Sequence, residues 1–211
     1  MIKLIKNVLS IDIDFFMKDL IEYQQFVDDE LDDVNLSWDI AKMKYKKDFV
    51  LDEDALLWVK DLIKQKCDNV EKFCIIQEHD EIYKLMKSWG CNNASCTNID
   101  YHHDITYHQE DNKLNIENWV KYARKDNLIH SYLWIHQDGS EMCLDSPIDF
   151  IHGSWKDFTY KEIDLIPKFD AVVFCISKYF TPYQYWNIAE DLQSYLIKVL
   201  NLNKIIKDIK N

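Results

Sequence analysis

Short apolar runs rich in β-branched residues alternate along this chain with segments in which apolar residues recur every three or four positions. The first pattern is typical of buried strands, and the second is typical of amphipathic helices. We expect strands at 7–13, 72–77, 96–100, 130–135 and 170–176. Strands that alternate with helices favour an α/β fold, built in layers around a mostly parallel sheet.

Helix boundaries follow from capping residues. We expect helices at about 53–66, 80–89, 116–125 and 182–201. Asp52 is a suitable N-cap for the first, and Gly90 suits the left-handed position after the second. Asn115 is expected to cap the third. Before the last, Thr181-Pro182-Tyr183-Gln184 matches a capping box with proline at the first helical position.

Composition bounds the number of domains and the class of partner. The chain has 211 residues, of which 47% are hydrophobic and 14% aromatic. This is enough for one sizeable core, so we expect a single domain over residues 1–211. The formal net charge of −12 argues against nucleic acid and suits a cationic substrate, although acidic surfaces also serve solubility alone.

Targeting signals and cysteine spacing bear on the cellular compartment. No segment resembles a secretory signal or has the length of a membrane span, so we expect a cytoplasmic protein without a membrane partner. The six cysteines have no CxxC spacing, and Cys74 and Cys175 are expected to be small buried hydrophobes. The oligomeric state stays open, with a homo-oligomer among the alternatives.

The acidic stretch 28–33 lies within the irregular segment 17–50, and we take it as solvated surface. The alternative is that it forms a rim of the site and attracts a basic peptide.

Acidic residues and histidines cluster where three apolar runs end. Asp12 and Asp14 close the first run, His79 follows the second, and Asp100-Tyr101-His102-His103-Asp104 follows the third. In an extended chain, alternation sends Asp12 and Asp14 to one side, and the same holds within the third cluster. Because the carboxyl ends of parallel strands meet at one edge of a sheet, we expect these side chains to converge there.

Mixed carboxylate and imidazole ligands are typical of a two-metal site, in which carboxylates bridge the ions and offset their charge. The set suits manganese, iron or zinc, and the lack of a thiolate argues against a structural zinc site. Magnesium prefers oxygen ligands and would leave His79 and His102 without a role. Each aspartate alone is as well explained as a cap or turn former. The conjunction of six such residues favours a metal site, and they are Asp12, Asp14, His79, Asp100, His102 and Asp104.

These motifs resemble a known superfamily. Asp100-Tyr101-His102-His103-Asp104 is similar to the Asp-x-His-x-Asp motif of the ureohydrolases, and Ser10-Ile11-Asp12-Ile13-Asp14 to their Ser-x-Asp-x-Asp motif. Glu78-His79-Asp80, Asn115-Ile116-Glu117-Asn118-Trp119 and Tyr132-Leu133-Trp134-Ile135-His136 are similar to the arginase-like family that contains the peptide arginases. Here the Asp-x-Asp motif comes first rather than last, as in a circularly permuted fold, which can keep the same site.

The resemblance implies a three-layer arginase-like catalytic domain with two Mn²⁺ ions per chain, a mostly parallel central sheet and flanking helices. One ion would be held by His79, Asp100, Asp104 and Asp12. The other would be held by His102 and Asp14, with Asp100 and Asp12 as bridges.

Catalytic roles are implied less completely by the resemblance. Asp104 or Asp14 would pass a proton to the departing amine, and His136 is a candidate shuttle. The glutamate that binds guanidinium and the proton-shuttling histidine of ordinary arginases have no counterpart that aligns here. Glu78 and Ser177 are the candidates for substrate binding. His103 and His108 are further candidates for the missing roles.

The resemblance implies an enzyme that converts arginine side chains of a ribosomally made precursor peptide to ornithine and releases urea. A ureohydrolase for a small free guanidino compound, arginine or agmatine, is the alternative. Single-zinc deacetylation of acyl-lysine occurs on a related fold but would leave His79 and Asp14 without purpose. A metal-free scaffold is disfavoured because all six ligand positions are filled.

Overall fold

The computed structural model describes residues 4–20, 23, 33–105, 113–140, 150–158 and 163–210. Most of the acidic stretch 28–33 and the candidate His108 lie outside the described residues. Within that part of the chain, no helix combines the length and apolar character needed to cross a membrane.

Six strands form one sheet in which every neighbouring pair is parallel. Its order is β4-β8-β1-β5-β6-β7. The strands are β1 (Asn7–Asp12), β4 (Lys72–Ile76), β5 (Ala94–Ile99), β6 (Ile129–His136), β7 (Ile151–Ser154) and β8 (Ala171–Cys175). The five predicted strands are therefore confirmed. The sequence pattern missed β7, a short edge strand that contains a histidine and a glycine in place of an apolar run.

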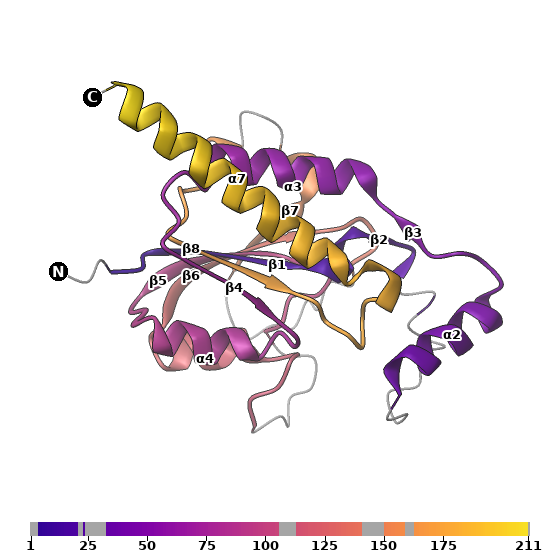
Figure 1. Cartoon of the computed structure of the whole chain (residues 1–211). Helices are drawn as coiled ribbons and strands as arrows, with labels where there is room; N and C mark the ends of the chain where they lie inside the picture. The colour runs from indigo at the N-terminus through magenta and orange to yellow at the C-terminus, as the bar shows by residue number, and fades with distance from the viewer. Residues whose placement is uncertain are drawn as a thin grey trace.

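Helices cover both faces of the sheet and complete the three-layer α/β architecture (Figure 1). Helices α3 (Glu53–Lys66) and α7 (Asn187–Lys210) share one apolar cluster with Leu9 and Ile11 of β1. Helices α4 (Glu81–Ser88) and α5 (Trp119–Lys125) share a second cluster with Val8. Because side chains alternate along a strand, Ser10 and Asp12 lie on the same side as Val8, toward α4 and α5.

Two helix ends follow the predicted capping. Asp52 accepts a hydrogen bond from the Ala55 backbone N–H at 3.2 Å and begins α3. Gly90 follows Trp89, the C-cap residue of α4, and has a φ of +70°, a conformation that glycine adopts without the strain of a Cβ atom.

Two other helix starts differ from the prediction. Helix α7 begins at Asn187, and Pro182 instead precedes a short 3-10 helix, Tyr183–Tyr185. The Thr181 hydroxyl makes no capping bond, so the capping-box prediction was wrong. Helix α5 begins at Trp119, and Asn115 accepts a hydrogen bond from the Glu117 N–H in the preceding turn at 3.0 Å.

The segment 17–50, which the sequence pattern left without elements, contains α2 (Val34–Tyr45) and the short antiparallel pair β2 (Met17–Lys18) and β3 (Val50–Leu51). Helix α2 buries only Ser37, Trp38 and Ala41, so it has no broad apolar stripe to reveal it. Trp38 anchors α2 to the domain, because its indole N–H donates to the Lys178 carbonyl at 3.0 Å.

Asp52 is expected to contribute more to stability than an ordinary cap, because it also accepts a hydrogen bond from the buried Gln137 amide at 3.1 Å. We expect Asp52→Ala to lower the free energy of unfolding by about 2–4 kcal/mol, the sum of a lost cap and an unsatisfied buried amide. Asp33→Ala, at the exposed cap of α2, is expected to cost about 1 kcal/mol. Urea denaturation measures both, and equal losses would contradict this account.

Candidate metal centre

The six predicted ligands lie at or just after the ends of three strands, β1, β4 and β5, at the carboxyl edge of the sheet. Asp12 is the last residue of β1, and Asp100 directly follows β5. His79 lies in the turn between β4 and α4. Asp14 does not continue an extended strand as the alternation argument assumed, because residues Ile13–Phe16 form a short 3-10 helix. That turn nevertheless brings the Asp14 carboxylate back to the same edge.

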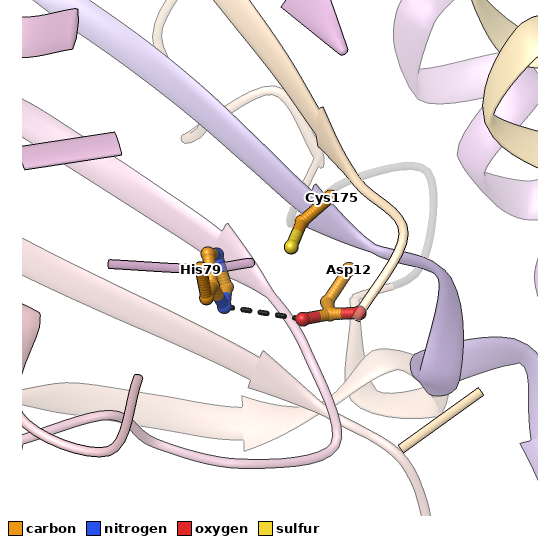
Figure 2. A group of neighbouring side chains, drawn as sticks. All are labelled: Asp12, His79 and Cys175. Carbon is orange, nitrogen blue, oxygen red and sulfur yellow. Dashed lines mark ion pairs between the residues drawn. The ribbon is translucent and has the colours of Figure 1, made fainter. Parts of the chain in front are cut away.

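His79 is the centre of a first group of ligands. Its Nδ1 lies 2.7 Å from Asp104 Oδ2, 3.0 Å from Asp100 Oδ2 and 3.2 Å from Asp12 Oδ2. The contact with Asp12 is drawn in Figure 2. All four side chains are at least 95% buried. Three carboxylate oxygens and one imidazole nitrogen therefore converge, and these are the four residues that the resemblance implied for one ion.

A second group surrounds His102. Its Nδ1 lies 2.9 Å from Asp14 Oδ2 and 3.8 Å from Asp100 Oδ1. Asp100 thus turns one oxygen toward each histidine, which is the position required of a bridging carboxylate. For Asp12, the contact with His79 places it in the first group, and the structure gives no comparable contact with His102. The bridging role of Asp12 stays a prediction.

Neighbouring polar groups hold the ligands in place. The Ser10 hydroxyl lies 2.7 Å from His79 Nε2, which leaves Nδ1 directed at the carboxylates. The Asn98 amide donates to Asp100 Oδ2 at 2.9 Å, and the Trp119 indole N–H donates to Asp104 Oδ2 at 2.6 Å. The Ser177 hydroxyl donates to Asp12 Oδ2. Such partners fix the orientation of metal ligands.

Gln137 fixes the turn that carries Asp14. Its amide nitrogen donates to the Phe15 carbonyl and to Asp52, each at 3.1 Å. Its amide oxygen accepts from the Trp155 indole at 2.6 Å and from the Asp138 backbone N–H at 3.1 Å. All four bonding positions of this buried amide are therefore used. The exit of β6, the start of α3 and the turn after β1 are joined at one residue.

Backbone strain accompanies two of these positions. Asp104 has a φ of 53° and Ser177 a φ of 48°, both in the left-handed region that L-residues adopt at a cost of about 1–3 kcal/mol. Both residues contact the aspartate and histidine cluster. Strain of this kind concentrates where the surrounding structure imposes a particular side-chain direction.

The cluster is short of positive charge. Burial, together with Asp12 and Asp100, raises the pKa of Asp14 well above its ordinary value. Burial and the neighbouring Asp100 raise the pKa of Asp104 to about 7. Burial would also raise the pKa of Asp100, but His79 and His102 outweigh it and lower that pKa to about 2.

Both histidines respond to the same excess of carboxylates. Burial opposes their protonation, but Asp104 and Asp100 raise the pKa of His79 well above its ordinary value. Asp14 and Asp100 likewise raise the pKa of His102 to about 9. In the described residues the ion pairs of these carboxylates are with histidine, and none is with lysine or arginine. This donor set fits divalent cations, which supply the missing charge.

A cavity of about 170 Å³ adjoins the cluster. Its lining consists of Asp12, His79, His102, Asp104, Ile116, Glu117, Ser177 and Phe180. The lining places Ser177, a predicted substrate-binding residue, at the cavity. Glu117 and Phe180 were not predicted as site residues. Glu117 lies in the segment that resembles the peptide arginases, and that resemblance was the signal available for it.

Two other predicted site residues lie elsewhere. Glu78 borders a neighbouring hollow with Asp80 and Glu81, and burial together with Asp12 raises its pKa to about 7. His136 stacks on Trp134 with ring centroids 4.6 Å apart. Neither side chain is among the residues lining the metal-centre cavity. Their proposed substrate-binding and proton-shuttling roles therefore have no support from this geometry.

His103 is also separate from the cavity. Its Nδ1 accepts a hydrogen bond from the Ile105 backbone N–H at 3.1 Å, and its ring packs on Trp134. Burial lowers the pKa of His103 to about 4. A buried imidazole with this partner fits a role in fixing the chain between Asp100 and Asp104.

Comparisons with known proteins identify no family. No protein-family model matches the chain, and no curated protein matches it. Among solved structures, it is similar to a hypothetical agmatinase from Burkholderia thailandensis, with 10% sequence identity and a TM-score of 0.45. The match covers 100% of this chain and 88% of the agmatinase chain. A similarity at this level carries no functional argument, which has to come from the site.

The charge shortage predicts how stability depends on pH in the absence of metal. His102 has its pKa raised from 6.5 to about 9, and Asp104 from 3.8 to about 7. Groups with raised pKa values contribute stability at low pH that is lost as pH rises through the folded-state pKa. We therefore expect the melting temperature of the chelator-treated protein to fall by several degrees between about pH 6 and about pH 9.

Thermal denaturation followed by circular dichroism measures this fall. His102→Gln is expected to flatten it, whereas His130→Gln, a substitution of an exposed histidine at the start of β6, is expected to retain it. The assigned electrostatics would be contradicted by a melting temperature that rises over this pH interval, or by a fall that is the same in His102→Gln as in the wild-type protein.

Proposed function

We propose that the chain is a binuclear metal-dependent hydrolase that acts on the guanidinium group of an arginine side chain within a peptide, yielding ornithine and urea. The observation that carries the proposal is that two aspartate and histidine groups share Asp100 beside a cavity. The motif resemblance noted in the sequence supports the same reaction class. Manganese is the metal implied by that resemblance, and the ligand types also suit iron or zinc.

When bound, a pair of divalent cations lowers the pKa of a shared water and supplies hydroxide near neutral pH. The chain would hold one cation through His79, Asp104 and Asp12, the other through His102 and Asp14, and both through Asp100. Because water can then provide the nucleophile, the reaction needs no nucleophilic side chain.

The cavity suits a cationic guanidinium group. Glu117 lies in its wall and offers a carboxylate for the planar cation, and this geometry favours Glu117 over Glu78 for the role. Carboxylates bind such forked donors with charge-assisted hydrogen bonds. A cavity of about 150 Å³ holds a benzene molecule, so about 170 Å³ accommodates a guanidinium group and the adjoining methylene groups.

The chemistry of the cavity wall restricts the class of substrate. Ile116 and Phe180 can contact the methylene groups of an arginine side chain. None of the described residues that line the cavity is lysine or arginine, so nothing there would pair with the α-carboxylate of free arginine. Arginine within a peptide has no such carboxylate, and agmatine is the small-molecule alternative that shares this property.

The hydrolysis adds hydroxide to the guanidinium carbon and breaks the bond between that carbon and the side-chain nitrogen. The departing amine then requires a proton to leave. Asp104 is the proposed donor, because it lines the cavity. Asp14 is fully buried beside His102 and is not among the cavity-lining residues, so it is the less suitable donor.

Urea release decides between the substrates. With Mn²⁺-loaded protein, we expect urea from an arginine-containing peptide at a kcat/KM at least about 10-fold above that for free arginine, because an unpaired carboxylate is costly in an acidic cavity. Agmatine is assayed beside them. Equal rates for agmatine and the peptide would favour the small-molecule alternative, and no urea from any substrate would refute the proposed reaction.

Glu117→Gln tests guanidinium binding. We expect this change to lower kcat/KM about 10- to 100-fold, because it removes a charge-assisted pair worth about 1.5–3 kcal/mol. Bound metal should be unchanged, because Glu117 is not in the ligand groups. Glu190→Gln, on the exposed face of α7, is the matched control and should leave turnover unaltered. An unaffected Glu117 variant would remove this residue from the substrate site.

A further inference from the structure

A thiol joins the ligand cluster at a place where the sequence predicted only carboxylates and imidazoles. Cys175 ends β8, and Asp12 is its partner in the register of β1. Both residues lie on the sheet face that α4 and α5 cover, as does His79. Figure 2 shows the three side chains of Asp12, His79 and Cys175 converging on one space.

The distances fit coordination of one cation by these three side chains. One ligand atom from each of Asp12, His79 and Cys175 lies within 4.8 Å of the other two, and all three residues are buried. Three protein ligands from sulfur, nitrogen and oxygen, with a fourth position left for water, is the arrangement found at open zinc sites. The cysteine is therefore part of a ligand set and not an isolated thiol.

The apolar surroundings do not account for the direction of the sulfur. Cys175 belongs to the apolar cluster beneath α4 and α5, but its Sγ lies 3.3 Å from the Ser177 hydroxyl. Ser177 in turn donates to Asp12. The sulfur thus faces the polar edge of the cluster, where a cation held by Asp12 and His79 would be within reach.

This thiol-containing group shares two ligands with the proposed binuclear centre. His79 Nε2 contacts Ser10, so Nδ1 is the nitrogen available to a cation, and the same Nδ1 faces Asp104 and Asp100. A single nitrogen lone pair binds one cation at a time. Occupation of the thiol-containing group and of the carboxylate group around His79 is therefore mutually exclusive.

We propose that Asp12, His79 and Cys175 form an alternative binding site for a thiophilic divalent cation such as zinc, cadmium or cobalt. On binding, the cysteine proton is released to solvent and the thiolate coordinates the cation. Thiolate ligands select such cations over manganese, which prefers oxygen. The coordination stands independently of the reaction, whereas its consequence, inhibition of manganese-dependent turnover by zinc, rests on the proposed function.

Cobalt is the direct probe, because a thiolate bound to Co²⁺ gives an intense charge-transfer absorption in the near ultraviolet. Chelator-treated protein is titrated with Co²⁺ while that absorption is recorded. We expect the band to develop in the wild-type protein and to be lost in Cys175→Ser. Cys96→Ser is the matched control, because Cys96 is equally buried on the same side of the sheet but belongs to no ligand group, and it should retain the band.

Two results would overturn the proposal: absence of the band in the wild-type protein, or its persistence in Cys175→Ser. X-ray absorption of the wild-type protein with one equivalent of zinc gives an answer even if the variant fails to fold. We expect one sulfur scatterer at about 2.3 Å from the zinc. A shell of nitrogen and oxygen alone would contradict thiolate coordination.

Measuring inhibition by zinc distinguishes a failure of the thiolate site from a failure of the proposed function. Urea release by Mn²⁺-loaded protein is measured with increasing zinc, each variant relative to its own rate without zinc. We expect Cys175→Ser to need at least about 10-fold more zinc for half-inhibition, corresponding to about 1.4 kcal/mol of zinc affinity. A cobalt band without urea release would refute the function alone, whereas urea release without the band would refute the thiolate site alone.

Discussion

The structure depends on confining four carboxylates at one buried sheet edge with only two imidazoles as counter-charges. Two ionised carboxylates about 4 Å apart repel each other by about 4 kcal/mol at an effective dielectric constant of about 20. Several such pairs would consume much of the roughly 5–15 kcal/mol by which a domain is stable. The raised pKa values of Asp14 and Asp104 show one response, which is to retain protons. Binding of divalent cations is the other response, which we propose for this site, because their charge would offset that of the carboxylates.

The parallel sheet brings the carboxylates and histidines together without unusual chain connections. Strands β1, β4 and β5 deliver their last residues to the same edge, and apolar clusters on both faces keep those strands in register. Gln137, Ser10 and Trp119 then hold the turns and the ligands by hydrogen bonds. These hydrogen bonds lie within the chain, so the fold itself sets the directions of the ligand side chains at the site. Among the described residues, the cavity is lined by carboxylates and by no lysine or arginine, which is why the substrate proposed is a guanidinium compound without a carboxylate.

The sequence predicted what depends on local pattern and spacing. Apolar runs identified five strands, and Asp52 marked the start of α3. Parallel strand ends implied the convergence of His79 with Asp100. Features decided by tertiary contacts were missed: α2 has little apolar periodicity, and the capping residues before α7 serve a separate turn. Cys175 is buried in an apolar cluster as predicted, but its position beside Asp12 follows from the pairing of β8 with β1, which periodicity does not reveal.

The central claim is that the aspartate and histidine groups around His79 and His102 bind a pair of divalent cations bridged by Asp100. Anomalous diffraction from crystals grown with Mn²⁺ tests it most directly, because the signal locates manganese without reference to activity. The account predicts two peaks, one beside His79 and one beside His102, with Asp100 contacting both. Crystals that diffract well yet show no anomalous peak between these side chains would contradict it.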